Sequence, residues 1–283
     1  MTTLQQWHEQ GDTFSFNGHE IFYLTQGDKQ KPALVLIHGF PTCSWDWAKI
    51  FPALSEHFYL ITLDMLGFGF SDKPKQDYSI FQQADIFDAL LKQLDIKQYY
   101  LLAHDYGDTV AQELLARHHQ SGQVCAVVFA NGGLFPETHH PVLLQKLLLS
   151  PVGFILSKLV RYEKFKKNFD HICAKKLSED ELGGFWQMLE HKGGVLIMHK
   201  LIAYMTERKQ NRERWVGVMQ QTQVPMLLID GLLDPISGAH MVERYEQLIP
   251  NPQVIKLADT GHYPQVESPA AFAQAALAFL MNH

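Results

Sequence analysis

The chain has 283 residues, of which 46% are hydrophobic and 19% charged, a balance that is typical of a folded globular protein and excludes a disordered one. Its formal net charge of -6 provides no basic field that would attract nucleic acid. Three cysteines are too few for a disulfide framework, so we expect a reducing compartment, the cytoplasm.

Membrane insertion is not expected from the N-terminus or from the most apolar stretch. Residues 1–12 lack the basic start and apolar run of a signal peptide. Residues 143–160 are apolar but are interrupted by Lys146, Pro151 and Lys158, so they make a poor transmembrane helix. Peripheral membrane contact stays open, as does the choice between monomer and dimer.

Short apolar runs alternate with helical patterns along the chain. Strands are predicted at 13–17, 21–25, 33–37, 59–63, 99–103, 124–130, 226–229 and 254–257. Helices are predicted at 44–54, 80–94, 106–118, 239–248 and 269–281. This alternation favours an α/β fold with a mostly parallel, doubly wound sheet and helices on both faces.

One long segment breaks the alternation. Residues 136–214 show helical patterns without a convincing strand, and they are long for a single connection. We therefore predict a helical cap inserted before the last two strands. The domains would be a first core part at 1–135, the cap at 136–214 and a second core part at 215–283. Ordinary crossover helices are the alternative.

Asp105 is the candidate nucleophile. It lies between an apolar strand and a helical pattern, flanked by the small residues Ala103 and Gly107, as a sharp strand-to-helix turn requires. A carboxylate at this turn needs no base to activate it and can attack directly to form an ester. The alternative is that Asp105 only caps the helix.

The loop His38-Gly39-Phe40-Pro41 follows the strand at 33–37. A backbone N–H in such a loop, with that of the residue after an elbow nucleophile, can hold an oxyanion. The amides of Phe40 and Tyr106 are therefore predicted to form the oxyanion hole.

Two further polar residues follow the last two strands. Asp234 lies in a loop after the strand at 226–229, which suits an acid that orients a histidine, whereas Asp230 should still lie in the strand. His262 follows the last strand and is the candidate general base, held by Asp234. The 15 histidines show no spacing typical of metal ligands, so neither a metal nor a cofactor is expected.

Taken in order, these motifs resemble the epoxide hydrolase and haloalkane dehalogenase branch of the α/β-hydrolase fold. The resemblance covers residues 14–280, and within the branch several strings are similar to the mesoderm-specific transcript group. They are HGFPT at 38–42, LGFGFSDKP at 66–74, HDYGD at 104–108, NGGLFPETH at 131–139 and RWVG at 214–217.

The resemblance implies a two-step reaction in which Asp105 forms an alkyl ester that His262 then helps water to hydrolyse. It also implies that a cap tyrosine protonates the oxygen of an opening epoxide. Tyr204, 21 residues before Pro225, matches that position, and Tyr162 is the candidate for a second donor; packing is the alternative role of both.

Leaving-group chemistry decides between the related activities. A halide would need N–H donors, and Phe40 and Tyr106 occupy the places where dehalogenases supply them, although Trp186 could substitute. Epoxide hydrolysis of a small apolar molecule is therefore the leading hypothesis. Haloalkane dehalogenation, ester hydrolysis and a non-enzymatic binding role are the alternatives. The apolar cap residues indicate either packing on the core or a tunnel for a lipid-like substrate.

Overall fold

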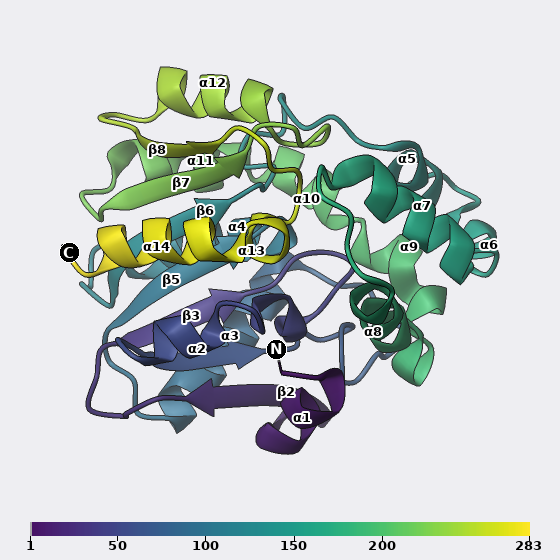
Figure 1. Cartoon of the computed structure of the whole chain (residues 1–283), viewed down its shortest axis with the longest axis horizontal. Coiled ribbons are helices and arrows are strands. Elements are labelled where there is room, and N and C mark those ends of the chain that lie inside the picture. Colours follow the sequence, from purple (N-terminus) through teal and green to yellow (C-terminus); the bar gives the residue numbers. More distant parts are fainter. Residues whose placement is uncertain (1) are drawn as a thin grey trace.

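The computed structural model describes residues 2–283, which fold around one eight-stranded sheet with the order β1-β2-β4-β3-β5-β6-β7-β8 (Figure 1). Strands β3 to β8 run parallel to one another; at one edge β2 pairs antiparallel with β4, and β1 pairs antiparallel with β2. The predicted mostly parallel sheet is therefore confirmed. The strands are β1 (Asp12–Phe16), β2 (His19–Gln26), β3 (Ala33–Ile37), β4 (Tyr59–Leu63), β5 (Tyr99–His104), β6 (Val124–Ala130), β7 (Met226–Gly231) and β8 (Gln253–Leu257).

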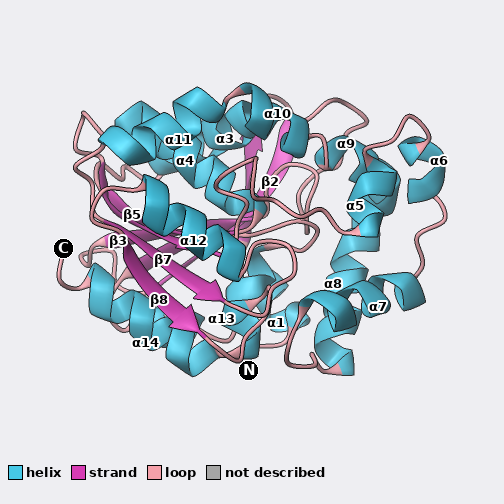
Figure 2. Ribbon diagram, turned by 90° about the horizontal axis from the view of Figure 1, so that it is seen from above, coloured by secondary structure: helices cyan, strands magenta, loops and turns pink. Residues whose placement is uncertain are grey.

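Helices cover both faces of this sheet, as continuous apolar strands require. Every residue of β3 and β4 is buried. The helices α3 (Ile80–Gln93), α4 (Tyr106–His118) and α11 (Arg212–Gln221) pack together on one face, and α14 (Pro269–Leu280) lies on the other (Figure 2). The short α2 (Phe51–Ser55) contacts α14, and α12 (Ala239–Leu248) packs against β7.

The segment between β6 and β7 forms helices and loops, without a strand in any of its residues. These helices gather at the end of the sheet where the parallel strands terminate (Figure 1). The insertion therefore precedes the last two strands, as predicted. Its elements before α11 are α5 (Leu143–Leu148), α6 (Gly153–Ser157), α7 (Tyr162–Ile172), α8 (Glu179–Glu190), the 3₁₀ helix η2 (His191–Ile197), α9 (Met198–Leu201) and α10 (Tyr204–Gln210).

The exact division into a core and a cap stays a prediction. The proposed border at 214/215 falls inside α11, a helix that packs on α4 of the core. Within residues 2–283, no helix combines the length and the apolar character needed to cross a bilayer.

The short helices differ from the sequence prediction at three places. Helix α1 (Leu4–Gln10) was not expected, although Thr3 and Gln6 form a capping box at its start and Trp7 is buried. The predicted helix at 44–54 is split into the 3₁₀ helix η1 (Ser44–Trp47) and α2, because Pro52 has no N–H to continue the helical hydrogen bonds. Helix α13 (Pro264–Glu267) is a single turn before α14.

Strand order places the candidate site. The chain runs from β3 to β4 on one side and then returns to β5 on the other side of β3. Loops that leave the carboxyl ends of β3 and β5 therefore diverge, and such a switch point in an open parallel sheet is where ligands bind.

Candidate active site

Asp105 occupies a strained turn between β5 and α4. Its backbone has φ 49° and ψ -108°, a conformation that costs energy for a residue with a side chain. The turn is tight: a Cβ on Gly107 would lie 2.4 Å from the carbonyl oxygen of Ile37, and one on Gly39 would lie 2.9 Å from Cβ of Asp105. Of the two small residues predicted around the turn, Gly107 is therefore sterically required.

The Asp105 carboxylate does not cap α4. Its side chain forms no capping hydrogen bond to α4, whereas its Oδ2 accepts from the amide of Phe40 at 2.9 Å. Burial raises the pKa of Asp105, while the charges of His262 and Arg208 and the amides of Phe40 and Tyr106 oppose that rise. The residues predicted for the oxyanion hole thus surround the predicted nucleophile.

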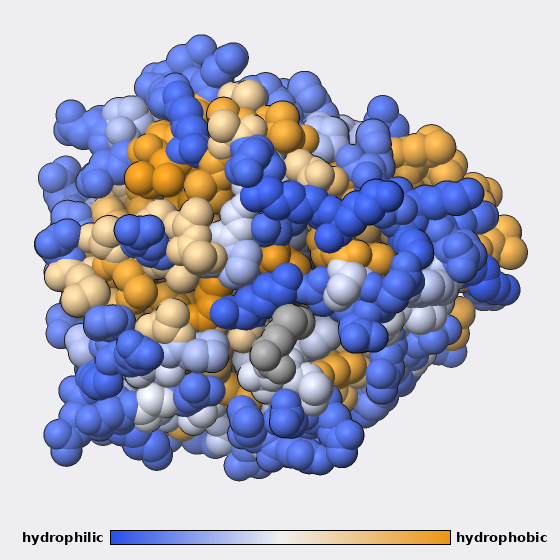
Figure 3. Space-filling model, viewed as in Figure 1, coloured by the Kyte–Doolittle hydropathy of each residue, from blue (hydrophilic) through white to orange (hydrophobic). Residues whose placement is uncertain are grey.

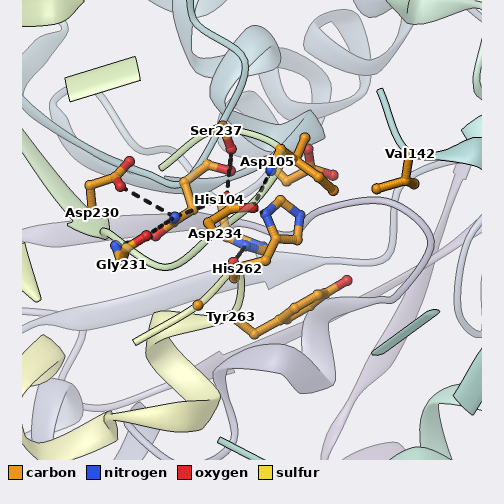
Figure 4. Close-up of polar contacts among 12 residues, drawn as sticks. His104, Asp105, Val142, Asp230, Gly231, Asp234, Ser237, His262 and Tyr263 are labelled. Atoms are coloured by element: carbon orange, nitrogen blue, oxygen red, sulfur yellow. Dashed lines mark hydrogen bonds and ion pairs between the residues drawn. The ribbon is translucent and has the colours of Figure 1, made fainter. Parts of the chain in front are cut away.

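His262 and Asp234 form a buried pair beside Asp105 (Figure 4). Nδ1 of His262 donates to Oδ2 of Asp234 at 2.7 Å. Although burial disfavours the imidazolium, the charge of Asp234 and this hydrogen bond, with a contribution from Asp105, raise the pKa of His262 to about 9. His262 is therefore protonated at neutral pH in this state of the site.

Further hydrogen-bond donors stabilise the charged form of Asp234. Its Oδ1 accepts from the amide of Ile236 at 2.7 Å, and its Oδ2 accepts from Asn131 Nδ2 at 3.0 Å and from Ser237 Oγ at 2.8 Å. Burial alone would raise the pKa of Asp234, but His262 and these hydrogen bonds lower it. Asp234 consequently orients the histidine while remaining charged.

Two other buried carboxyls lie nearby but lack such donors. Asp230 falls within β7, as predicted, and accepts only a long 3.5 Å hydrogen bond from Asn131. Asp108, on the first turn of α4, accepts from the amide of Ala130 at 3.3 Å. Burial raises the pKa of both carboxyls well above the usual range, which favours their neutral forms. Of the three carboxyls, Asp234 is thus the one whose charged form is best stabilised.

Tyr204, the first residue of α10, is buried beside Tyr106, the residue that follows Asp105. Its side chain is 1% exposed, and its hydroxyl has no hydrogen-bond partner among residues 2–283. The centre of its ring lies 4.6 Å from that of Tyr106. Burial and, after it, the negative charge of Asp105 raise the pKa of Tyr204.

Arg208 is a component of the site that the sequence interpretation missed. It is 2% exposed, and its Nε and Nη2 donate to Thr109 Oγ1 on α4 at 3.0 and 2.8 Å. Its guanidinium lies 4.8 Å from the centre of the Tyr204 ring, and Nη1 has no partner within residues 2–283. Arg208 follows Tyr204 by four residues, so helical spacing could have placed both on one face.

Neither Tyr162 nor Trp186 is brought to Asp105. The Tyr162 hydroxyl donates to Glu179 on α8 at 3.0 Å, in an exposed contact. The half-buried Trp186 packs against the rings of Tyr162 and Phe165. In this structure the Tyr162 hydroxyl is therefore engaged by a surface carboxylate, and its role as a second proton donor stays a prediction. The role of Trp186 with the leaving group likewise stays a prediction.

A narrow pocket of about 20 Å³ lies beside His262. It is mostly apolar and is lined in part by Phe40, Val142, Leu144 and Phe165. A larger hollow of about 650 Å³ lies between α1 and α8, but Asp105 and His262 do not line it. No group of three or more His, Cys, Asp or Glu side chains in residues 2–283 is placed to bind a metal.

Known proteins resemble this chain over almost its full length. A family model described as the alpha/beta hydrolase fold matches residues 32–269. The mesoderm-specific transcript homolog protein of Bos taurus is 42% identical over 98% of this chain and 88% of its own length. LipZ of Mycobacterium tuberculosis is 32% identical, with 99% of each chain covered. A loop variant of haloalkane dehalogenase DbeA from Bradyrhizobium elkanii has a TM-score of 0.83 at 22% identity, over 96% of each chain.

Proposed function

This chain belongs to the α/β-hydrolase family, and we propose that it hydrolyses epoxides through an alkyl ester on Asp105. The observation that carries the proposal is the position of the Asp105 carboxylate. It sits at the elbow, 2.9 Å from the Phe40 amide and next to the His262–Asp234 pair. An aspartate at this position attacks without a base, so a saturated carbon with a strained leaving group is the matching electrophile.

In the first step, one Asp105 oxygen forms a bond to an epoxide carbon, and the C–O bond of the ring breaks. The electron pair stays on the ring oxygen, which takes the hydroxyl proton of Tyr204. Arg208 stabilises the resulting phenolate because its positive charge lies over the ring. With Asp105 neutralised as an ester, the pKa of His262 falls, and the imidazolium proton returns to Tyr204.

In the second step, neutral His262 takes a proton from water, and the hydroxide attacks the ester carbonyl of Asp105. The amides of Phe40 and Tyr106 stabilise the oxyanion of the tetrahedral intermediate. Collapse breaks the bond to the alkyl oxygen, which takes the proton of the newly added hydroxyl and leaves as the diol. The cycle ends with Asp105 ionised and His262 protonated, the charges of the resting site.

The test is a single turnover in H₂¹⁸O with enzyme in excess over a terminal alkyl epoxide. We expect ¹⁸O in the Asp105 carboxylate, found by mass spectrometry of the peptide, and none in the diol. The variant His262→Gln should accumulate the ester as a mass increase on Asp105. Direct attack by water would instead label the diol and leave no adduct, which would refute the nucleophile assignment.

Haloalkane hydrolysis is the second candidate, because Nη1 of Arg208 has no hydrogen-bond partner within residues 2–283 and could donate an N–H to a departing halide. Halide release from a bromoalkane that exceeds epoxide turnover would favour it. Ester hydrolysis that survives Asp105→Ala would contradict both candidates. Binding of an epoxide without turnover, unchanged in Asp105→Asn, would instead favour a non-enzymatic role.

A further inference from the structure

Exposed apolar side chains are concentrated on one part of the segment between β6 and β7. We call this set the apolar face, and its members are between 41% and 71% exposed. They belong to α5, α6 and the turns that follow each helix. The apolar face consists of Leu143, Leu147, Val152, Phe154, Ile155 and Leu159.

These side chains lie on elements that pack against one another. Helix α5 packs against α6, and α6 packs against η2, which adds the exposed Leu196. In Figure 3, hydrophobic residues reach the surface at the right-hand edge, where Figure 1 shows α6 in the same view. Single exposed apolar residues are normal on soluble proteins, but a contiguous group of this kind indicates an interaction surface.

The charge around the apolar face is opposite to that of the whole chain. Residues 141–167 carry six basic side chains and one acidic one, a net charge of +5, whereas the complete chain carries -6. Lys146, Lys158, Lys164 and Lys167 are exposed and form no salt bridge with a carboxylate in residues 2–283. Lys146 lies within α5 and Lys158 directly follows α6, so these cations border the apolar side chains.

We propose that the apolar face docks the protein onto the surface of an anionic lipid bilayer. Apolar side chains enter the boundary between head groups and acyl chains, and the lysines pair with anionic head groups. A second copy of the chain fits less well, because a symmetric dimer through this face would bring two basic surfaces together. The docking requires no helix to cross the membrane.

Docking through the apolar face would bring the narrow pocket beside His262 close to the lipid. Val142 and Leu144, which flank Leu143 in the chain, line the narrow pocket together with His262. A molecule dissolved in the bilayer would therefore meet the segment that covers the pocket. The docking inference stands on the surface alone and does not depend on which bond the enzyme hydrolyses.

The experiment is co-sedimentation of the full chain with vesicles of phosphatidylcholine alone and of phosphatidylcholine with 30% phosphatidylglycerol. We expect stronger partitioning into the anionic vesicles, reduced by salt. The triple variant F154S/I155S/L159S should lower the partition coefficient by at least about tenfold, given the transfer free energy of three large apolar side chains. Replacing Lys146 and Lys158 with glutamine should weaken binding to the anionic vesicles by about fivefold for each lysine at low salt.

The matched control is L233S/M281S, which removes two apolar side chains that are 57% and 59% exposed elsewhere on the surface. It should bind vesicles like the unaltered chain, and circular dichroism should show that all variants fold. Absence of binding to both vesicles overturns the proposal, as does equal binding by the triple variant. A dimer in analytical ultracentrifugation that the triple variant abolishes, without vesicle binding, would assign the face to self-association instead.

Discussion

The His262–Asp234 pair should make the stability of the folded protein depend on pH between about 6.5 and 9. The pKa of His262 rises from 6.5, its ordinary value, to about 9 in the folded chain. Because the folded state binds this proton more tightly, its contribution to stability is complete below pH 6.5. The contribution is then lost as the pH rises through 9. A shift of this size corresponds to about 3 kcal/mol in the free energy of unfolding.

The measurement is urea unfolding of the wild type and of His262→Gln at several pH values between 6 and 9.5. For each protein, the free energy of unfolding at pH 9.5 is subtracted from that at pH 6. The difference between the two results is the pH-dependent contribution of His262. Other groups cancel in this comparison. One of them is Lys73, whose pKa is lowered to about 8, mainly by burial. In the variant, Asp234 keeps its hydrogen bonds from Asn131, Ser237 and the Ile236 amide.

We expect the wild type to lose about 3 kcal/mol more than the variant between these pH values. The variant Asp234→Asn provides a second comparison. It should also lose this pH dependence of stability, because the asparagine carries no charge to stabilise the imidazolium. Identical pH profiles for the wild type and His262→Gln would refute the reasoning. The pair would then be no more protonated in the folded chain than histidine is in the unfolded one.

Three further substitutions probe the turn and the residues above it. Tyr204→Phe should slow formation of the Asp105 ester by about 10² or more in rapid-quench experiments, but leave its hydrolysis unchanged; equal slowing of both steps would contradict the role of proton donor. Arg208→Met should raise the pKa of Asp105, because a positive charge that lowers it is lost, and so move the acid limb of the ester-formation rate to higher pH; Arg208→Lys, which keeps the charge, should shift it less. Gly107→Ala should destabilise the fold by about 2 kcal/mol or more in urea unfolding, since its Cβ would meet two backbone carbonyls; unchanged stability would mean that the turn relaxes freely.

The sheet and the elbow were readable from the sequence because their signals are local. Strands at 33–37, 59–63 and 124–130 match the structure to the residue, since parallel strands buried on both faces appear as uninterrupted apolar runs. The choice of Asp234 over Asp230 also followed from local position, as one lies in a loop and the other in β7. Both predictions needed only the order of the residues along the chain.

The chemistry above the elbow depends on packing between segments far apart in the chain, and the sequence gives no direct measure of it. Arg208 looks like a surface residue in sequence, but tertiary contacts bury it, among them its hydrogen bonds to Thr109 on α4. Tyr162 was a candidate donor because of its place in the cap, yet its hydroxyl contacts Glu179. The choice of partner in these cases is set by tertiary contacts, which a motif does not encode.

The hydrogen bonds between Arg208 and Thr109 tie the helical segment to the turn that carries Asp105, four residues earlier on the chain. Tyr204 and Arg208 both belong to α10, so in the proposed reaction an outward movement of that helix would remove the proton donor and its cation at the same time. Asp105 would then keep its position, since its turn is built from core residues alone. If the proposed reaction holds, an open molecule would keep the attacking carboxylate but lack its assistance, and reactivity would require α10 to be packed on the core.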